Sequence, residues 1–447
     1  MGITIVQKGD LSVRKKNPKI ALVLAGGAVT GGAFKLGGLK ALDDFLVNRK
    51  TTEFDTYVGL SAGAVLAAPL AAGVSPAEML KSLDGQSSQF SRFGPQDVYQ
   101  LALRDFITRP AQFALDVLAF LPGTVSDLLQ QVPSLAGTLE EPLRNALRQP
   151  SLGGLQAVLA PIGEALAKRR GFPSPLDYLP SGIFDNSSIE AYLRSNLERS
   201  GKPNDFRELH RVTKKELYIG AMNLDTAERV VFGYDEDTSV TVSEAVQAST
   251  ALPGFYKPAR INGIDYVDGG VRRTANIDVA IEHGADLVIC YNPFRPFSNR
   301  VRRTPKNGGY EIEGKLLADD GLLVVINQVF RTLLHSRLQY GLRQYQDDPN
   351  FRGDIVVIEP KETDRHVFQL SAMAYWQRLP AAQYGYISVT ESIQQNYDLI
   401  KQILESYGIL MTRKQVRAGL ESLRDDDEEE ASKVLLRDVP RRNLSVA

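Results

Sequence analysis

Disulfide bonds and cysteine-based metal sites are the first features that this sequence excludes. Its 447 residues include four histidines and a single cysteine, Cys290. One cysteine forms no intramolecular disulfide and supplies no cysteine-based metal site, so no metal is expected. Cys290 lies in the apolar run 287–291, which places it in the core. Such cysteine usage is typical of a reducing compartment, and we expect a cytoplasmic protein.

The chain also lacks an excess of one charge and any long apolar run. The 52 basic and 53 acidic residues give a formal net charge of -1, so no basic field favours nucleic acid. No stretch of about 18 uncharged apolar residues predicts a membrane span. No long apolar stretch precedes Lys8, so we expect no signal peptide. The length is sufficient for a large core.

Glycine is plentiful, and two glycines flank a serine in the pentapeptide 59–63, Gly-Leu-Ser-Ala-Gly. Residues 54–58 are typical of a short buried strand, and residues 64–70 are typical of the start of a helix. A serine at such a strand-to-helix turn is forced into a strained conformation that exposes its hydroxyl. Side chains at Gly59 and Gly63 would collide across the turn. Ser61 is therefore a candidate nucleophile.

A second glycine cluster, 25–32, follows the apolar strand-like run 20–24 and precedes a helix-like segment. Such a turn presents backbone N–H groups at the positive end of a helix dipole, where they bind an anion. The anion is either a phosphate or the oxyanion of a tetrahedral intermediate. The spacing fits neither the dinucleotide-binding fingerprint nor the phosphate-binding loop that ends in Gly-Lys-Ser/Thr.

A third element is an aspartate at the end of a strand-like run, Asp268, which is followed by Gly269 and Gly270. A carboxylate within hydrogen-bond reach of a serine hydroxyl can act as its general base. The structural alternative is an ordinary Asp-Gly turn.

Together, and in this order, the three motifs resemble those of the patatin-like phospholipase family of lipid acyl hydrolases. The resemblance covers residues 18–92 and 181–295. It implies a lipid substrate and a cofactor-free mechanism, in which Ser61 attacks an ester carbonyl and Asp268 accepts its proton without a histidine. It further implies that backbone N–H groups of Gly26, Gly27, Ala28 and Ala62 stabilise the oxyanion, and that Gly59, Gly63, Gly269 and Gly270 are the motif glycines.

One departure from the family pattern keeps a second interpretation open. The glycine-rich loop lacks the usual Arg or Lys, and the nearest cation is Lys35, one turn further along. This departure favours a catalytically weak, lipid-binding or scaffold member of the family. A third interpretation is an esterase with a Ser-Asp-His triad that uses His283 or His335. We favour it less because only about one sheet strand precedes the serine, and because His283 fits a helix C-terminus.

Alternating strand-like and helix-like runs from 20 to 295 predict a three-layer α/β/α sandwich with a mainly parallel sheet. We expect this domain to span 18–360 and to contain a helical insertion at 93–180. A helical C-terminal region with an acidic tail is expected at 361–447. The insertion has apolar residues at helical spacing, which suits a cap that meets the membrane periphery or packs against another subunit of a homo-oligomer.

Three local predictions complete the sequence analysis. A hairpin is expected around residues 225–226, and a buried strand of the main sheet is expected at 354–359. A long helix is expected at 316–345. Its core-facing residues are predicted to be Val324, Val325, Val329, Leu333 and Leu334.

Overall fold

The computed structural model describes residues 2–103, 105–106, 108–109, 112, 179–306, 309–424 and 433–439. The chain forms two compact units, one of residues 1–100 with 184–447 and one of residues 101–183. Most of the predicted insertion at 93–180, with its apolar helices, lies outside the described residues, as does the acidic run 425–430. The first unit contains the central sheet.

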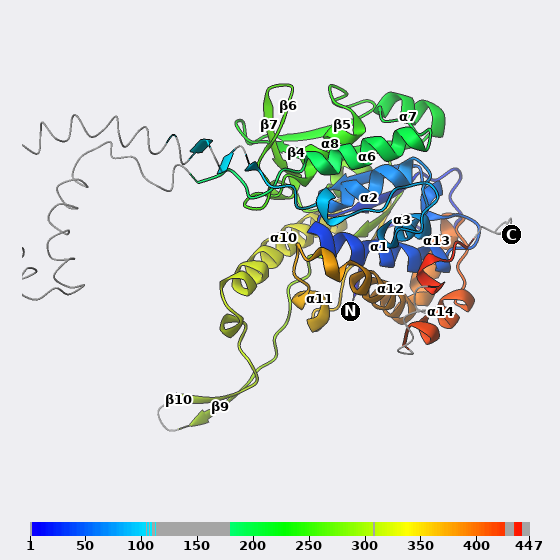
Figure 1. Cartoon of the computed structure of the whole chain (residues 1–447). Coiled ribbons are helices and arrows are strands. Elements are labelled where there is room, and N and C mark those ends of the chain that lie inside the picture. The colour runs from blue at the N-terminus through cyan, green and yellow to red at the C-terminus, as the bar shows by residue number, and fades with distance from the viewer. Residues whose placement is uncertain are drawn as a thin grey trace, which may run out of the picture. The chain divides into compact units, whose positions relative to one another are not determined.

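A sheet of nine strands forms the centre of this unit (Figure 1). Five strands run parallel to one another in the order β11-β8-β2-β3-β4, and β1 lies antiparallel at the β11 edge. The pairs β4–β5, β4–β7 and β6–β7 are antiparallel. The strands are β1 (Ile3–Gln7), β2 (Ile20–Leu24), β3 (Thr56–Leu60), β4 (Glu216–Asn223), β5 (Arg229–Gly233), β6 (Ala259–Ile261), β7 (Ile264–Asp268), β8 (Leu287–Tyr291) and β11 (Asp354–Ile358).

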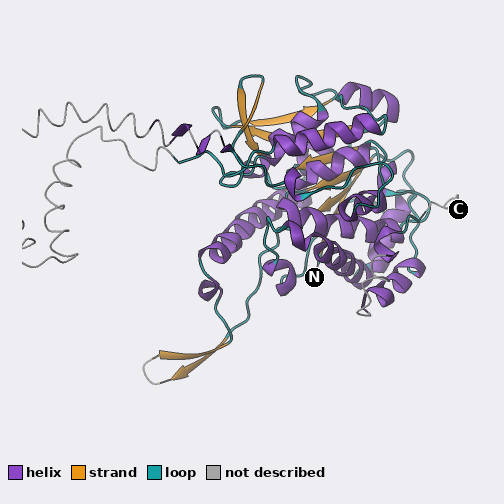
Figure 2. Ribbon diagram, in the orientation of Figure 1, coloured by secondary structure: helices purple, strands orange, loops and turns teal. Residues whose placement is uncertain are grey.

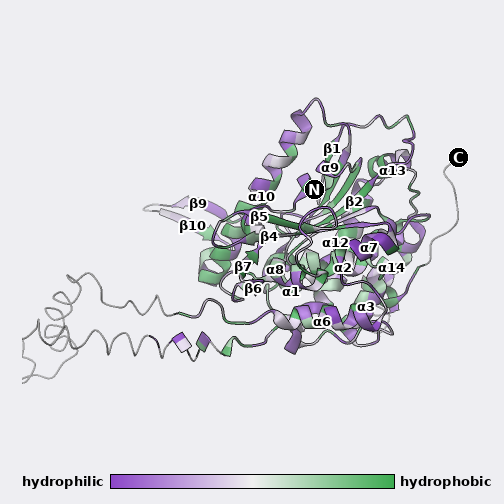
Figure 3. Ribbon diagram, turned by 90° about the horizontal axis from the view of Figure 1, so that it is seen from above, coloured by the Kyte–Doolittle hydropathy of each residue, from purple (hydrophilic) through white to green (hydrophobic). Residues whose placement is uncertain are grey.

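Helices cover both faces of the sheet, which confirms the predicted three-layer α/β/α architecture (Figure 2). Successive side chains of a strand point to opposite faces. Leu22 and Leu24 of β2 accordingly join one core cluster, and Ala21 and Val23 join the other. β2 is buried along its whole length and is green in Figure 3, as expected of a parallel strand covered on both sides.

The larger cluster lies between the sheet and the helices α1 (Ala28–Phe45), α2 (Ala62–Ala71), α3 (Pro76–Asp84), α6 (Ser187–Arg199), α7 (Phe206–Thr213), α8 (Val242–Thr250), α12 (Arg378–Gln395) and α13 (Tyr397–Ser406). The smaller cluster contains side chains of α9 (Ile277–Glu282) and of the second half of α10 (Leu322–Asp347). The remaining described helices of more than one turn are α11 (Arg365–Gln369) and α14 (Lys414–Arg424).

The C-terminal helix α12 packs tightly on α1. A Cβ atom added to Gly37 of α1 would lie 1.8 Å from the carbonyl oxygen of Ala382. A Cβ atom added to Gly385 of α12 would lie 1.9 Å from the carbonyl oxygen of Phe34. The two backbones can approach this closely only because glycine has no side chain. The C-terminal helices therefore belong to the same compact unit as the sheet.

Two local predictions are confirmed. β4 and β5 form the expected hairpin, in which Tyr218 pairs with Gly233 and Met222 pairs with Arg229. The strand expected at 354–359 is β11, which is buried at each of its positions and lies between β1 and β8.

The predicted inward face of the long helix is wrong. The helix exists as α10, but three of the five residues expected in the core are exposed, because the first half of α10 turns polar side chains toward the protein. The two residues of α10 that are fully buried lie further along the helix. The exposed residues are Val325, Val329 and Leu333, the partly buried ones are Val324 and Leu334, and the fully buried ones are Leu338 and Leu342.

Next to α10 in the chain is a small hairpin of β9 (Arg302–Lys306) and β10 (Gly309–Glu313), which pair with each other and form their own two-stranded sheet. In Figure 1 this hairpin extends away from the main sheet. A short 3-10 helix, Leu317–Asp320, connects it to α10. Within the described ranges, none of the helices has the length and apolarity required to cross a membrane.

Candidate active site

Ser61 lies at a sharp turn between β3 and α2. Its φ of 54° and ψ of -130° are strained values for a residue with a side chain. Two hydrogen bonds stabilise the turn: the Ser61 N–H donates to Ser249 Oγ over 2.8 Å, and Ser249 Oγ–H donates to the Gly220 carbonyl over 2.7 Å. Ser249 was not among the functional residues predicted from the sequence, although it lies in the segment that leads to the predicted aspartate.

The two glycines beside Ser61 are required by close backbone contacts. A Cβ atom on Gly63 would lie 2.0 Å from the Leu24 carbonyl oxygen at the end of β2. A Cβ atom on Gly59 would lie 2.5 Å from the Cα atom of Ala64 in α2. A side chain at either position would push α2 away from the sheet.

Asp268 reaches Ser61 because β3 and β7 share one edge of β4. The opposite edge of β4 is occupied by β5 over Tyr218–Met222. On the shared edge, Leu60 at the end of β3 pairs with Gly220, and Asp268 at the end of β7 pairs with the next residue, Ala221. The chain turns into Ser61 directly after Leu60, so the two strand ends bring Ser61 and Asp268 together.

The side chains of Ser61 and Asp268 lie close enough for the Ser61 hydroxyl to lower the pKa of Asp268, and each residue is only 4% exposed. The backbone N–H of Gly270 donates a hydrogen bond to Asp268 Oδ1, over 2.8 Å. Burial raises the pKa of Asp268 to about 6, since these two interactions lower it by less than burial raises it. The carboxylate is thus ionised at neutral pH and can accept the proton of the serine hydroxyl.

The glycine-rich loop lies against Ser61. A Cβ atom on Gly26 would be 3.3 Å from Ser61 Cβ, so the loop backbone touches the serine. α1 begins at Ala28, whose φ of 51° is in the left-handed region. The first N–H groups of a helix have no partner within the helix, which leaves them available to an anion. Ala28, Ala62 and Ser61 line one cavity, and Gly26 and Gly27 immediately precede Ala28.

Lys35 lies beneath this loop and not in the solvent. Its side chain is fully buried, and its ammonium group donates hydrogen bonds to the carbonyl oxygens of Ala25 and Gly26, the latter over 3.1 Å. Burial lowers the pKa of Lys35 to about 7, although the negative charge of Asp268 acts in the opposite direction. In a trans peptide the N–H points opposite to the carbonyl. The two bonds therefore turn the N–H groups of Gly26 and Gly27 away from Lys35.

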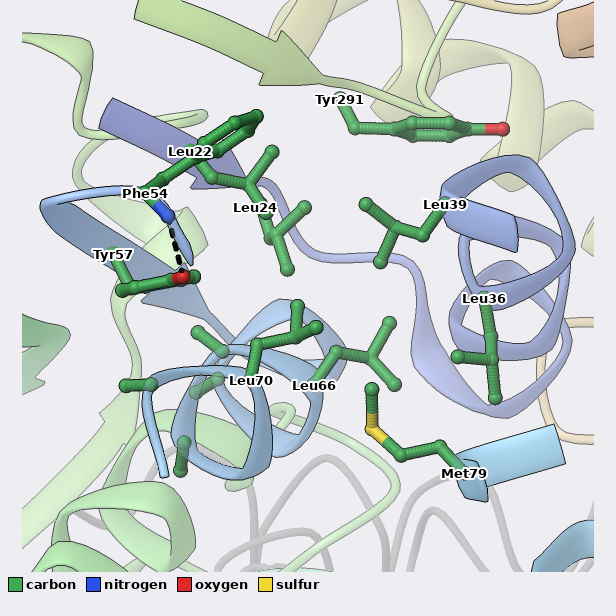
Figure 4. Packing of buried hydrophobic residues seen from close by; sticks show 14 of the residues in the cluster. Leu22, Leu24, Leu36, Leu39, Phe54, Tyr57, Leu66, Leu70, Met79 and Tyr291 are labelled. Atoms are coloured by element: carbon green, nitrogen blue, oxygen red, sulfur yellow. Dashed lines mark hydrogen bonds between the residues drawn. The ribbon is translucent and has the colours of Figure 1, made fainter. Parts of the chain in front are cut away.

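The cavity above Ser61 is almost entirely apolar and has a volume of about 120 Å³. It is close in size to cavities that hold benzene. Leu36, Leu66 and Met79 point into the same space from α1, α2 and α3 (Figure 4). Other apolar lining residues include Val29, Phe90, Val98, Ile189, Leu193, Leu252, Tyr256 and Met373. The polar lining residues besides Ser61 are Ser82, Tyr192, Thr250 and Arg378.

The two histidines considered for a triad have other partners. His283 ends α9, where its Nδ1 lies 2.8 Å from the Val279 carbonyl oxygen and its ring packs on Tyr218. His335 Nδ1 lies 3.1 Å from Glu359 Oε1. None of these contacts involves Ser61 or Asp268. In the part of the chain that the structure describes, no three His, Cys, Asp or Glu side chains form a group that could hold a metal ion.

The sequence model of the patatin-like phospholipases matches residues 22–281, more than half of the chain. The chain belongs to the patatin-like phospholipase family. The matched range includes the turn at Ser61, the glycine-rich loop and Asp268, which confirms the resemblance noted in the sequence.

Among curated proteins, this patatin-like protein is 26% identical over 104 residues to "Probable lipid hydrolase 463L" of Invertebrate iridescent virus 6, which is 23% of this chain and 36% of the viral protein. It is 25% identical over 144 residues to "Uncharacterized protein YjjU" of Escherichia coli K12, which is 32% of this chain and 36% of YjjU. The chain thus matches 36% of the length of each of these two relatives.

Among solved structures, VipD from Legionella pneumophila has 15% sequence identity and a TM-score of 0.32, over 94% of this chain and 79% of VipD. Human GIVD cytosolic phospholipase A2, solved in complex with methyl gamma-linolenyl fluorophosphonate, has 11% identity and a TM-score of 0.31, over 89% of this chain and 61% of that chain.

Proposed function

We propose that this protein is a lipid acyl hydrolase that cleaves carboxylic ester bonds with Ser61 and Asp268 as a catalytic dyad. The observation that carries the proposal is the juxtaposition of the two buried side chains at an apolar cavity. Family membership and the probable lipid hydrolase among the relatives support the same class of reaction.

In the proposed reaction Ser61 Oγ attacks the ester carbonyl carbon while its proton moves to Asp268. The C–O bond to the leaving alcohol then breaks, and Asp268 returns the proton to that alcohol. Water next attacks the acyl-enzyme, again with Asp268 as the base, and releases the fatty acid and free Ser61. The pKa of about 6 suits this role, because Asp268 is ionised at pH 7 yet basic enough to share a proton.

The negative charge of the tetrahedral intermediate requires donors beside Ser61. We assign this role to the backbone N–H groups of Gly26, Gly27, Ala28 and Ala62, each of which is in the glycine-rich loop or at the start of a helix. One such donor is worth roughly 3 kcal/mol of transition-state stabilisation. Lys35 supports the proposal, because it orients the peptides of this loop from below, in a chain whose loop has no cation of its own.

The apolar walls of the cavity favour an acyl chain as the group next to the scissile ester. Most of the exposed surface of the cavity is apolar, so methylene groups gain from leaving water there. The substrate class that fits is therefore a fatty acyl ester of a lipid.

A fluorophosphonate probe and a panel of phospholipid and neutral-lipid esters test the proposal. We expect the probe to label wild-type protein, and we expect labelling and hydrolysis to disappear in Ser61→Ala. Ser88→Ala, which alters an exposed serine of a surface loop, is the matched control and should behave as wild type. The dyad is refuted if Ser61→Ala retains wild-type turnover while folded.

A further inference from the structure

The first half of α10 has its amphipathic faces reversed. Five large apolar side chains lie along one side of the helix at spacings of one to four residues, and they face away from the protein. Val329 is 52% exposed, and Phe330 is 59% exposed. The five residues are Leu322, Ile326, Val329, Phe330 and Leu333, which we call the outer stripe.

The inner side of the same half-helix is polar and anchored. Arg331 Nη1 donates to the Pro293 carbonyl over 2.9 Å, and Gln328 Nε2 donates to the Phe297 carbonyl over 2.7 Å. The Phe297 N–H in turn donates to Gln328 Oε1 over 3.1 Å. These bonds fix the rotation of the helix about its axis, so the outer stripe cannot turn inward without breaking them.

A stripe of exposed large apolar residues at helical spacing marks a surface that another apolar phase covers. The charge of the surrounding segment indicates whether that phase is a lipid surface or another protein. Between residues 295 and 343 the chain has nine basic and four acidic residues, a net charge of +5, although the whole chain has a net charge of -1. On β9, Arg302 is 81% exposed and pairs with Glu313, and Lys306 is 63% exposed and pairs with Glu311. Arg303 lies between them, so the hairpin has a net charge of +1. Apolar side chains beside clustered basic ones are the combination that binds an anionic lipid surface.

We propose that the outer stripe of α10 and the exposed arginines of the hairpin β9–β10 form a docking surface for an anionic lipid membrane. The stripe enters the boundary between head groups and acyl chains, while the hairpin contacts negatively charged head groups. This surface consists of other residues than the insertion at 93–180, for which membrane contact was predicted from the sequence. The choice of a lipid surface over a protein partner rests on the proposed function together with the positive charge.

The docking surface is linked to the candidate active site by one loop. Arg331 of α10 binds the carbonyl of Pro293, and the Pro293 ring would lie 3.0 Å from a Cβ atom on Gly27. The adjacent Phe294 ring would lie 3.1 Å from a Cβ atom on Gly26. The loop at Pro293 and Phe294 therefore connects α10 to the glycine-rich loop that we assign to the oxyanion.

Vesicle co-sedimentation tests the docking surface. Full-length protein with Ser61→Ala, which prevents hydrolysis, is mixed with vesicles of phosphatidylglycerol and phosphatidylcholine or of phosphatidylcholine alone. Adding Val329→Glu and Leu333→Glu should lower partitioning onto the anionic vesicles by roughly a hundredfold, about tenfold for each side chain. Val212→Glu with Leu399→Glu is the matched control, because it makes the same two changes at exposed positions of α7 and α13. The control should bind as the Ser61→Ala parent does.

The contribution of the positive charge of the hairpin to vesicle binding is tested separately. Arg302→Gln with Arg303→Gln should weaken binding to the anionic vesicles and leave any binding to phosphatidylcholine unchanged. Raising the salt from about 0.1 M to about 1 M should have the same effect, because the screening length falls from about 10 Å to about 3 Å. Equal binding of the stripe variant and its control would overturn the proposal. A different outcome would also overturn it: wild-type protein binds no vesicles and is a dimer in light scattering, whereas the stripe variant is a monomer. The stripe would then contact a second copy of the chain.

A soluble short-chain ester separates this inference from the proposed function. With Ser61 intact, wild-type protein and the stripe variant should hydrolyse it at equal rates, because no interface is involved. If folded wild-type protein does not hydrolyse this ester, the dyad is refuted, even when the protein binds vesicles. Normal hydrolysis together with no vesicle binding refutes the docking surface alone.

Discussion

Replacing Asp268 by asparagine should abolish hydrolysis and yet stabilise the fold. Burial raises the pKa of Asp268 from 3.8 to about 6, which means that the native structure disfavours the charged carboxylate. A difference of roughly two pKa units corresponds to about 3 kcal/mol. The Asp268→Asn variant keeps an oxygen that accepts from the Gly270 N–H but carries no charge. It should therefore be up to about 3 kcal/mol more stable above pH 6.

The sign of the effect follows from proton binding. Between pH 3.8 and about 6 the folded protein binds more protons at Asp268 than the unfolded chain does, so its stability falls as the pH rises through this window. The advantage of Asp268→Asn should be absent near pH 3.5 and complete at pH 8. At pH 8 Lys35 is mostly uncharged, since its pKa is about 7, and it complicates the comparison little.

Urea denaturation at both pH values, together with lipid-ester hydrolysis, measures the two effects. Asp265→Asn is the control on the same strand, because an ion pair with Arg260 lowers the pKa of Asp265. Its stability at pH 8 should fall by less than about 1 kcal/mol, with activity unchanged. Hydrolysis in Asp268→Asn should fall by roughly a hundredfold to ten-thousandfold. An Asp268→Asn variant that is less stable than wild type at pH 8, or that keeps full activity, would refute the reasoning.

Four further outcomes are expected. In wild type, kcat/KM for hydrolysis should rise about tenfold per pH unit below pH 6 and level off above it, because Asp268 must be ionised to act as the base; a pH-independent rate would contradict this. Ser61→Gly should be inactive but about 1 kcal/mol more stable to urea than Ser61→Ala, because glycine relieves the strain at φ 54°. Lys35→Met should lower kcat by roughly tenfold or more, since the two buried carbonyls lose the donor that orients their peptides; unchanged kcat would remove Lys35 from the positioning of the loop. Gly63→Ala should destabilise by about 2 kcal/mol or more in thermal unfolding, because its Cβ would lie 2.0 Å from the Leu24 carbonyl oxygen.

Features that depend on neighbouring residues were predictable from the sequence. The glycines around Ser61 are needed because the turn from β3 to α2 is tight, and this requirement concerns residues only a few positions apart. The β4–β5 hairpin follows from two strand-like runs with a turn between them, and β2 follows from a continuous apolar run. Local sterics and periodicity suffice for such elements.

The face of α10 was not predictable in the same way. Apolar spacing reveals that a helix has an apolar side, but it does not reveal where that side points. The outward rotation is decided by the bonds of Gln328 and Arg331 to a loop that lies more than 30 residues earlier in the chain. The position of Lys35 beneath the glycine-rich loop likewise depends on the packing of α1 against the sheet and α12.

The sequence by itself determined the three motifs and the turn that strains Ser61, because glycine requirements and strand-to-helix turns are set by adjacent residues. Only the tertiary structure decided that Asp268 lies beside Ser61. The two residues are separated by more than 200 positions, and they meet because β3 and β7 end next to each other on one edge of β4. Strand register, which hydrogen bonds across the whole sheet establish together, is the physical reason for that meeting.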